Sequence, residues 1–165
     1  MSATYAEMLN GAPLARRAPG ARHELICGRL HKWMKASVAN FAGTRLLAPR
    51  SEVRLSLRHT VCPDLALVAT ATGKVWLVAE IVSSDDHQPD TVIKKQIYEE
   101  MKLPRLWMID PRYDNVEVYH SNEYGLALKS ILAGQELLTE KLLPEFQLTI
   151  AELFAAEPQR GENHR

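Results

Sequence analysis

The chain lacks several features that would place it in a specialised class of proteins. It has two cysteines, Cys27 and Cys62, which lie in apolar surroundings without the spacing of a metal-ligand pair. It has no apolar run of about 18 residues and no charged, apolar leader, so we expect neither a membrane span nor a secretory signal. We therefore expect a cytoplasmic protein whose cysteines are reduced core residues.

The chain also lacks net charge, which leaves no global indication of a nucleic-acid partner. Twenty basic and twenty acidic residues balance, but residues 1–60 contain ten Lys or Arg against three acidic residues. A basic first part beside an acidic second part suits a protein that binds phosphates with one and a cation with the other. Chance and the needs of solubility produce the same asymmetry.

The remaining composition is that of an ordinary globular protein, with 46% hydrophobic residues. The length of 165 residues suits one domain whose core needs no disulfide or structural metal. We expect this domain over residues 1–155, with an N-terminal arm at 1–20 that contains a turn. The polar residues 156–165 are expected to form a disordered tail.

Hydrophobic spacing predicts both helices and strands. From Ala21 to about Gly43 apolar residues recur at helical spacing, which predicts an amphipathic helix. A capping box at Thr149 to Glu152 predicts a short helix near the C-terminus. Alternating or continuous apolar residues predict a half-exposed strand at 45–57, a hairpin at 61–82, and further strands at 105–110, 115–120 and 126–133.

Two carboxylates lie in the predicted hairpin. Glu80 is inside an apolar strand, where a carboxylate needs a cation or several donors beside it. If the strands fold about Thr72, Asp64 lies directly opposite Glu80, with Cβ atoms roughly 5 Å apart. A slip of one residue would place the two on opposite faces. Alternation along the second strand places Trp76, Val78, Glu80 and Val82 on one face, and Asp64 shares that face if the register holds.

Carboxylates this close repel each other, so one takes up a proton unless a cation lies between them. Their oxygens suit a hard ion such as magnesium or manganese, which can generate or orient a hydroxide for attack at phosphorus. For Glu80 the alternative is a buried salt bridge to an arginine, although none lies nearby in the sequence. Asp64, after Pro63, is also typical of a turn.

The helix after the hairpin, which we expect to begin at Pro89, contributes a lysine. Lys94 lies about 60° from the centre of its apolar stripe and Lys95 about 160° away, so Lys94 is expected to lean inward and Lys95 to be solvated. Lys94 could stabilise charge growing on a phosphate, with Tyr98 hydrogen-bonded to it or to the phosphate. The alternative is a lysine that snorkels to the surface. The stripe consists of Ile93, Ile97 and Met101 and includes Asp90.

These residues resemble the Uma-type restriction endonuclease family of the PD-(D/E)XK nuclease superfamily. The resemblance covers nearly the whole chain. It rests on Pro63-Asp64, Glu80-Ile81-Val82-Ser83, Lys94 with Tyr98, and Leu103 to Pro111, and extends to Glu7–Gly11, Pro19–His23, Leu143–Phe146 and Glu152–Phe154.

The resemblance implies an α/β (α+β) fold with a restriction-endonuclease-like core, in which helices flank a mixed central sheet. It also implies a divalent metal, Mg or Mn, held by Asp64, Glu80 and the backbone carbonyl of Ile81. Glu7 and His23 are lesser candidates, as auxiliary ligands or proton carriers. The alternatives are a hydrogen-bonding role in the arm for Glu7 and a place in the first turn of its helix for His23.

The chain departs from the superfamily pattern at two places. The basic residue normally two positions after the glutamate is replaced by Val82, and the family resemblance places its substitute on the following helix, in agreement with Lys94. The usual serine-proline step is replaced by an acidic loop, Ser83 to Asp86.

We therefore predict a metal-dependent endonuclease that hydrolyses phosphodiester bonds, with DNA as the expected substrate. Asp64 and Glu80 would hold the metal, Lys94 would orient the nucleophile or stabilise the transition state, and Tyr98 would support Lys94. The alternative is a catalytically silent binding or scaffolding module, favoured by the zero net charge and the absence of a DNA-reading segment. A homodimer that acts through partner recognition is a third alternative.

Overall fold

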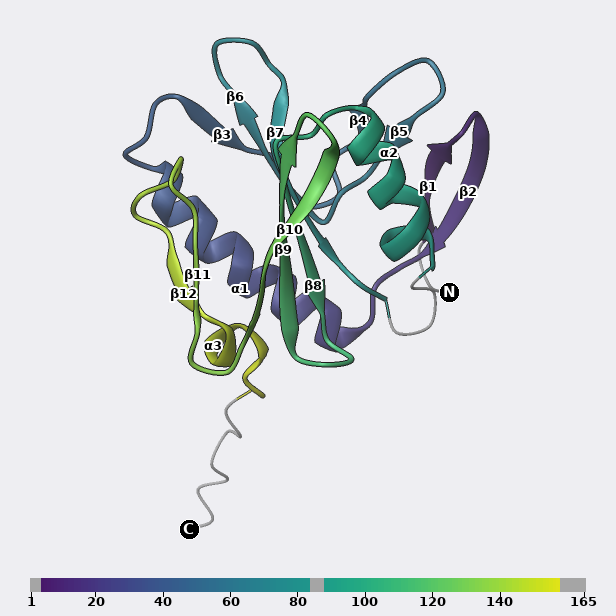
Figure 1. The fold of residues 1–165 in the computed structure, drawn as a ribbon. Helices are drawn as coiled ribbons and strands as arrows, with labels where there is room; N and C mark the ends of the chain where they lie inside the picture. Colours follow the sequence, from purple (N-terminus) through teal and green to yellow (C-terminus); the bar gives the residue numbers. More distant parts are fainter. Residues whose placement is uncertain (1–3, 84–87, 158–165) are drawn as a thin grey trace.

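The computed structural model describes residues 4–83 and 88–157, and a six-stranded sheet lies at its centre (Figure 1). The strand order is β10-β9-β8-β7-β6-β3. β7 and β8 are parallel and the other neighbouring pairs are antiparallel, so the sheet is mixed, as predicted. The strands are β3 (Thr44–Leu46), β6 (Leu65–Ala69), β7 (Val75–Ile81), β8 (Arg105–Asp110), β9 (Asn115–Asn122) and β10 (Gly125–Ala133).

Helices cover the two faces of this sheet (Figure 1). On one face lies α1 (Ala21–Val38); on the other lies a π-helical turn, η1 (Pro89–Lys94), that continues into α2 (Lys95–Glu100). Successive residues of β7 enter different cores: Leu77, Ala79 and Ile81 pack with α1, whereas Val78, and Val82 just after the strand, pack with α2. Because side chains alternate along a strand, Glu80 faces the α2 side.

The N-terminal arm is a β-hairpin within a second, four-stranded sheet of order β2-β1-β5-β4. Its turn is Asn10-Gly11, where both residues have positive φ (54° and 77°), as in the type I′ turns that Asn-Gly favours. The predicted turn in the arm is therefore confirmed. The strands are β1 (Thr4–Leu9), β2 (Ala12–Arg17), β4 (Val53–Arg54) and β5 (Thr60–Val61).

The C-terminal part adds a two-stranded sheet and a short helix. β11 (Leu137–Thr139) pairs with β12 (Gln147–Thr149), and α3 (Ile150–Phe154) follows directly. The predicted cap is confirmed, since the backbone amide of Glu152 donates to Thr149 Oγ1 at 3.2 Å. This helix packs Leu153 and Phe154 into the core that α1 shares with the sheet.

The register of the central hairpin is as predicted near the carboxylates. Leu65 pairs with Ala79 and Leu67 with Leu77, and a register shift follows between Leu67 and Val68. The prediction that Trp76 shares the face of Glu80 is wrong: Trp76 packs against the α1 core, because a register shift at the start of β7 changes the alternation there.

Two element boundaries also differ from the predictions. The strand expected at 45–57 is absent as one element, since the described chain there forms only β3 and the two-residue β4. Pro49 cannot donate to a sheet and Arg50 adopts a positive φ of 57°, so the chain turns between them. The first helix ends at Val38, before Gly43.

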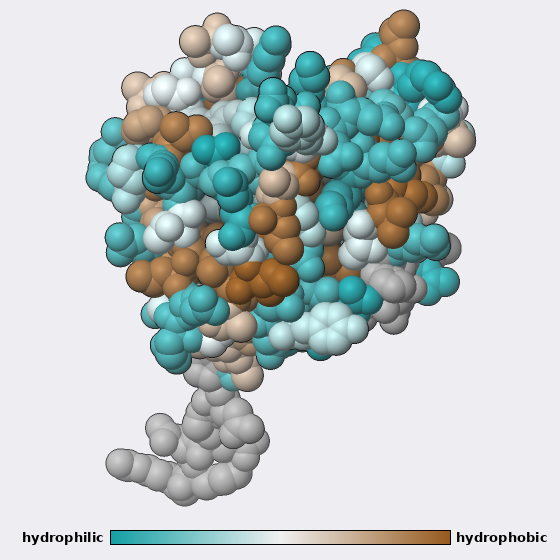
Figure 2. Space-filling view, viewed as in Figure 1, coloured by the Kyte–Doolittle hydropathy of each residue, from teal (hydrophilic) through white to brown (hydrophobic). Residues whose placement is uncertain are grey.

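The surface in Figure 2 is mixed, with hydrophobic residues gathered over β10 to β12. Ile131 and Leu137 are each about half-exposed there. The edge strand β10 has a bulge between Leu128 and Ser130, a common protection of an exposed edge. The structure describes a single chain, and the homodimer stays a prediction.

Three predictions concern the composition of the chain. Both cysteines are buried and free, as expected. Within the described residues no helix is long and apolar enough to cross a membrane. The acidic stretch Ser84 to Asp86 and the tail from 158 onward lie outside the described residues.

Candidate active site

The first of two polar clusters surrounds Asp64, which lies just before β6. Its Oδ2 accepts from the backbone amide of Ile81 at 2.8 Å, which ties the loop to β7. His23, in the first turn of α1, places Nε2 3.3 Å from Asp64 Oδ1 and 3.2 Å from the carbonyl oxygen of Ile81. Arg50 Nη1 is also 3.3 Å from Asp64 Oδ1, and its guanidinium continues to Glu24.

The second cluster surrounds Glu80 on β7. Lys94 Nζ lies 2.6 Å from Glu80 Oε1 and 2.7 Å from Glu7 Oε2, so one ammonium joins two carboxylates. Tyr98 donates its hydroxyl to Glu80 Oε1 at 2.6 Å. The side chains of Glu7, Glu80 and Lys94 are at most 2% exposed. This cluster is therefore a buried ionic network.

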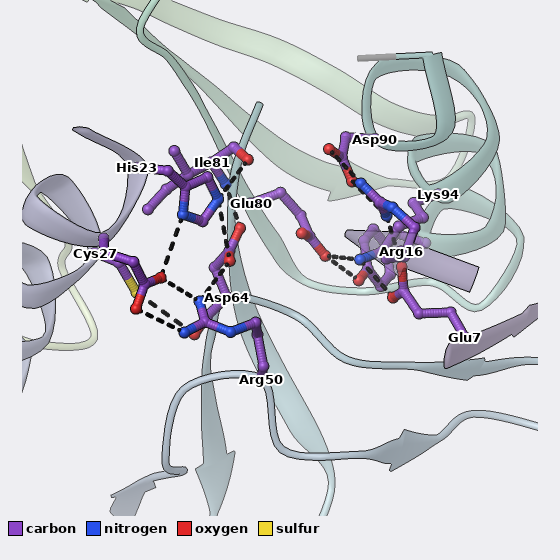
Figure 3. A network of polar contacts seen from close by, with 12 residues as sticks. Glu7, Arg16, His23, Cys27, Arg50, Asp64, Glu80, Ile81, Asp90 and Lys94 are labelled. Atoms are coloured by element: carbon purple, nitrogen blue, oxygen red, sulfur yellow. Dashed lines mark hydrogen bonds and ion pairs between the residues drawn. The ribbon is translucent and has the colours of Figure 1, made fainter. Parts of the chain in front are cut away.

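Asp64 lies just before β6 and Glu80 lies on β7, and the two side chains point to different partners (Figure 3), so the expected direct opposition of the two carboxylates is not found. Asp64 is directed toward His23 and Arg50, whereas Glu80 is directed toward Lys94 and Glu7. The structure therefore brings Lys94 to Glu80, and His23 to Asp64 and Ile81. The sharing of one ion by Asp64, Glu80 and Ile81 stays a prediction.

Several local expectations are settled by these contacts. Lys94 leans inward and does not snorkel, since its side chain is 1% exposed. Lys95 is not simply solvated, because it is half-buried with Nζ 4.4 Å from the centre of the Tyr119 ring. Tyr98 supports Glu80 rather than Lys94. The partner of Glu80 is a lysine, not an arginine, and Met101 of the predicted stripe is 40% exposed because α2 ends at Glu100.

The environment of Asp64 favours its ionised form. Burial alone would raise the pKa of this carboxyl, but hydrogen bonds from His23 and from the Ile81 amide lower it below its usual value. His23 shows the complementary effect: burial would lower the pKa of the imidazole, but Asp64 raises it. The pair is thus a carboxylate beside an imidazole that readily carries a proton.

The environment of Glu80 favours the protonated form. Burial raises the pKa of this carboxyl to about 8, because desolvation of the charge outweighs the attraction of Lys94, and Asp90, Asp64 and Glu7 oppose ionisation further. Burial alone would disfavour the Lys94 ammonium, but Glu80 and Glu7 raise its pKa. Two neighbouring carboxyls with pKa values shifted in opposite directions are typical of sites that combine acid and base roles.

This shift predicts how stability depends on pH. Unfolded Glu80 loses its proton near pH 4.5 and folded Glu80 near pH 8, so its contribution is fully present below pH 4.5 and is lost as pH rises through about 8. We expect the free energy of unfolding of the natural protein to fall across this window relative to Glu80→Gln, which mimics the protonated side chain. Urea unfolding at several pH values measures this; a constant difference between the two proteins would contradict the assignment.

A cavity of about 740 Å³ opens beside Asp64, and its walls come from β2, the start of α1 and the ends of β7 and β8. Asp64 and Ile81 line it, but Glu80 and Lys94 do not. Four arginines also line it: Arg16, Arg17, Arg22 and Arg112. Arginines beside a carboxylate and a peptide carbonyl give this cavity groups for both phosphate and metal.

The oxygen donors here fit a hard divalent cation, although no group of three His, Cys, Asp or Glu side chains within 4–83 and 88–157 is arranged to hold one. The oxygens of Asp64, Glu80 and Ile81 that could bind a metal ion are each contacted by a side-chain nitrogen of the protein. His23 Nε2 in particular lies between Asp64 Oδ1 and the Ile81 carbonyl, and its buried Nδ1 makes no hydrogen bond. Carboxylate and carbonyl oxygens are the ligands that magnesium and manganese prefer.

Arg50 and Glu24 of the first cluster were not predicted as site residues, nor were Arg16 and Asp90, which form an ion pair beside Glu7. Arg16 could have been found, because the Asn-Gly turn fixes a register in which it shares a face with Glu7. Asp90 was expected in an apolar stripe, and the need for a cation beside it follows from that position. Arg50 reaches Asp64 through a local turn, for which the sequence has no periodic signal.

The mixed sheet and the flanking helices are those of a restriction-endonuclease-like fold. The chain belongs to the Uma2 family, described as "Putative restriction endonuclease", whose model matches residues 3–151. A solved structure described as a "putative nuclease belonging to DUF820", from Anabaena variabilis, has a TM-score of 0.75 at 18% identity and covers 90% of this chain and 89% of its own. That likeness shows the fold. No curated protein matches the chain. The predicted family and fold are confirmed.

Proposed function

We propose that this protein is a metal-dependent endonuclease that hydrolyses phosphodiester bonds in DNA. The observation that carries the proposal is the arginine-lined cavity beside Asp64 and the Ile81 carbonyl. Glu80, which precedes Ile81 on β7, is buried against Lys94. Membership of a restriction endonuclease family supports the reaction class. DNA is the substrate that the family description suggests.

Asp64, Glu80 and the Ile81 carbonyl are the residues that would hold a magnesium or manganese ion. Such an ion supplies a hydroxide-like nucleophile and neutralises charge on the phosphate. Lys94 stabilises negative charge that develops on the phosphate, because an ammonium in a site of low dielectric acts strongly there. Tyr98 holds Glu80 in its present orientation by its hydrogen bond, and this bond is released when Glu80 binds the ion. His23 moves a proton at Asp64, or adds a nitrogen ligand beside it.

The proposed reaction requires a change in side chains. Glu80 points away from Asp64 and neither it nor Lys94 lines the cavity, so Glu80 must turn toward Asp64 before the two can share an ion. Loss of the Glu80 proton favours this change, since the ionised carboxylate binds a cation. Three of the arginines that line the cavity, Arg17, Arg22 and Arg112, would hold the phosphates of the substrate.

The direct test is cleavage of supercoiled plasmid, single-stranded DNA and RNA of matched sequence, each with Mg²⁺, Mn²⁺ or EDTA. We expect cleavage of DNA with either ion and none with EDTA. Cleavage of RNA alone would contradict the proposed substrate. Cleavage that persists in EDTA would contradict the metal dependence.

The second candidate is a binding module that keeps the nuclease fold without cleaving. The observation that favours it is the burial of Glu80 and Lys94, which contact each other and do not line the cavity. Calorimetry with Mn²⁺ separates the two functions. Binding that is lost in Asp64→Asn supports the nuclease, whereas no binding at millimolar ion supports the module.

A further inference from the structure

Arg16, on β2, is the link between the cavity and the buried Glu80 cluster. Its Nη1 lies 2.7 Å from Glu7 Oε1, and its two terminal nitrogens contact the carboxylate of Asp90 at 3.1–3.2 Å. The Arg16 guanidinium also lies over the ring of Tyr5, with its carbon 6.0 Å from the ring centre. The Arg16 side chain is only 6% exposed, yet the residue lines the cavity.

Glu7 connects Arg16 to the rest of the site. While Oε1 accepts from Arg16, Oε2 accepts from Lys94 at 2.7 Å and from the backbone amide of Cys62 at 2.8 Å. Cys62 lies two residues before Asp64. A single carboxylate therefore holds both the lysine on η1 and the loop that carries Asp64, and Arg16 fixes the orientation of that carboxylate.

The arrangement matters when Glu80 leaves its present partners. Lys94 is held by two carboxylates, and a Glu80 that turns toward Asp64 leaves Glu7 as the remaining one. Asp90, on the same turn as Lys94, is held by the other side of the Arg16 guanidinium. We propose that Arg16 is a positioning residue that fixes Glu7 and Asp90 and thereby keeps Lys94 in place when Glu80 turns toward a metal ion. This proposal rests on the proposed nuclease function.

A lysine cannot replace Arg16 in this role. The planar guanidinium directs separate N–H groups at Glu7 and at both oxygens of Asp90, whereas an ammonium is a single point charge. Arg16→Lys therefore keeps the charge but loses the fork. We expect its activity to lie between those of the natural protein and Arg16→Ala.

The kinetic test compares Arg16→Ala, Arg16→Lys and a matched control, Arg45→Ala, at saturating Mg²⁺. Arg45 is exposed on β3 and does not line the cavity. We expect kcat of Arg16→Ala to fall about 10- to 100-fold, the usual effect of losing a residue that orients a metal-site group. KM for DNA should change less than about threefold, and ethylguanidinium should restore part of kcat. A rise in KM with unchanged kcat would overturn the proposal, because it would make Arg16 a substrate-binding residue instead.

A second test needs no nuclease activity. Lys94 in the folded protein is labelled with an amine-acetylating ester, and its rate is followed by mass spectrometry beside amide hydrogen exchange in α1. We expect Lys94 to react about tenfold faster or more in Arg16→Ala, with exchange in α1 unchanged, because the opening is local. Labelling that rises only together with exchange in α1, or not at all, would overturn the proposal. If the natural protein cleaves nothing, the proposed function fails, and this measurement still decides whether Arg16 positions Lys94.

Discussion

Asp64→Asn and Glu80→Gln are expected to lower DNA cleavage by about a thousandfold each, at the upper end of what the loss of one electrostatic group costs an enzyme. Both substitutions keep the shape of the side chain and remove its negative charge. Asp64 carries that charge in the resting protein, because its pKa is lowered, and Glu80 acquires it when its proton leaves. The measurement is the rate of plasmid nicking at saturating Mg²⁺.

The control for this comparison is Glu100→Gln. Glu100 is exposed at the end of α2 and does not line the cavity, so its substitution should leave the rate within about twofold, since surface changes away from special features have small effects. Equal rates in the natural protein and in both site variants would disprove the assignment of these carboxylates. A loss in Asp64→Asn alone would restrict the metal site to Asp64 and its neighbours.

Lys94→Met is expected to have the second large effect, on stability as well as on cleavage. Removal of the buried ammonium leaves Glu7 and Glu80 without their shared cation, and breaking a buried ion pair in this way costs about 3–5 kcal/mol. For a chain of this size we expect Tm to fall by on the order of 10 °C. Thermal and urea unfolding measure the loss.

The adjacent lysine provides a matched control. Lys95→Met removes a half-buried ammonium that lies over Tyr119, and such a contact is worth about 0.5–1 kcal/mol. The double variant Lys94→Met/Glu80→Gln should regain part of the lost stability, because no carboxylate at 80 remains to be neutralised. It should not regain cleavage. Equal losses for the two single lysine variants would contradict the buried network.

Most of the fold follows from patterns that the sequence displays directly. The apolar alternation in β7 and the helical spacing in α1 depend on which side of each element is buried, and both elements lie where that spacing predicts. The hairpin register near Asp64 follows from the polar turn around Thr72. Trp76 could not be placed, because a bulge adds a residue without a signal in the composition.

The site was predicted less completely than the fold. Helical periodicity distinguishes Lys94 from Lys95, although the first turn is a π-helix, because an inward lysine needs only an approximate angle. Whether Glu80 contacts Lys94 and Tyr98 or turns toward Asp64 depends on the relative energies of these interactions. The spacing of residues in the sequence does not predict these energies. The contacts of the Arg16 guanidinium with Glu7 and Asp90 depend on how two separate elements, the N-terminal hairpin and η1, pack together.

The central claim is that Asp64, Glu80 and the Ile81 carbonyl bind one divalent ion after Glu80 turns from Lys94. A crystal structure of the protein with Mn²⁺, with the ion located by its anomalous scattering, tests this most directly. We expect one manganese in contact with the carboxylates of Asp64 and Glu80 and with the Ile81 carbonyl, at the oxygen distances usual for such ions, while Lys94 stays bound to Glu7. Manganese bound elsewhere, or a Glu80 that keeps its contacts with Lys94 and Tyr98 at millimolar Mn²⁺, would contradict the claim.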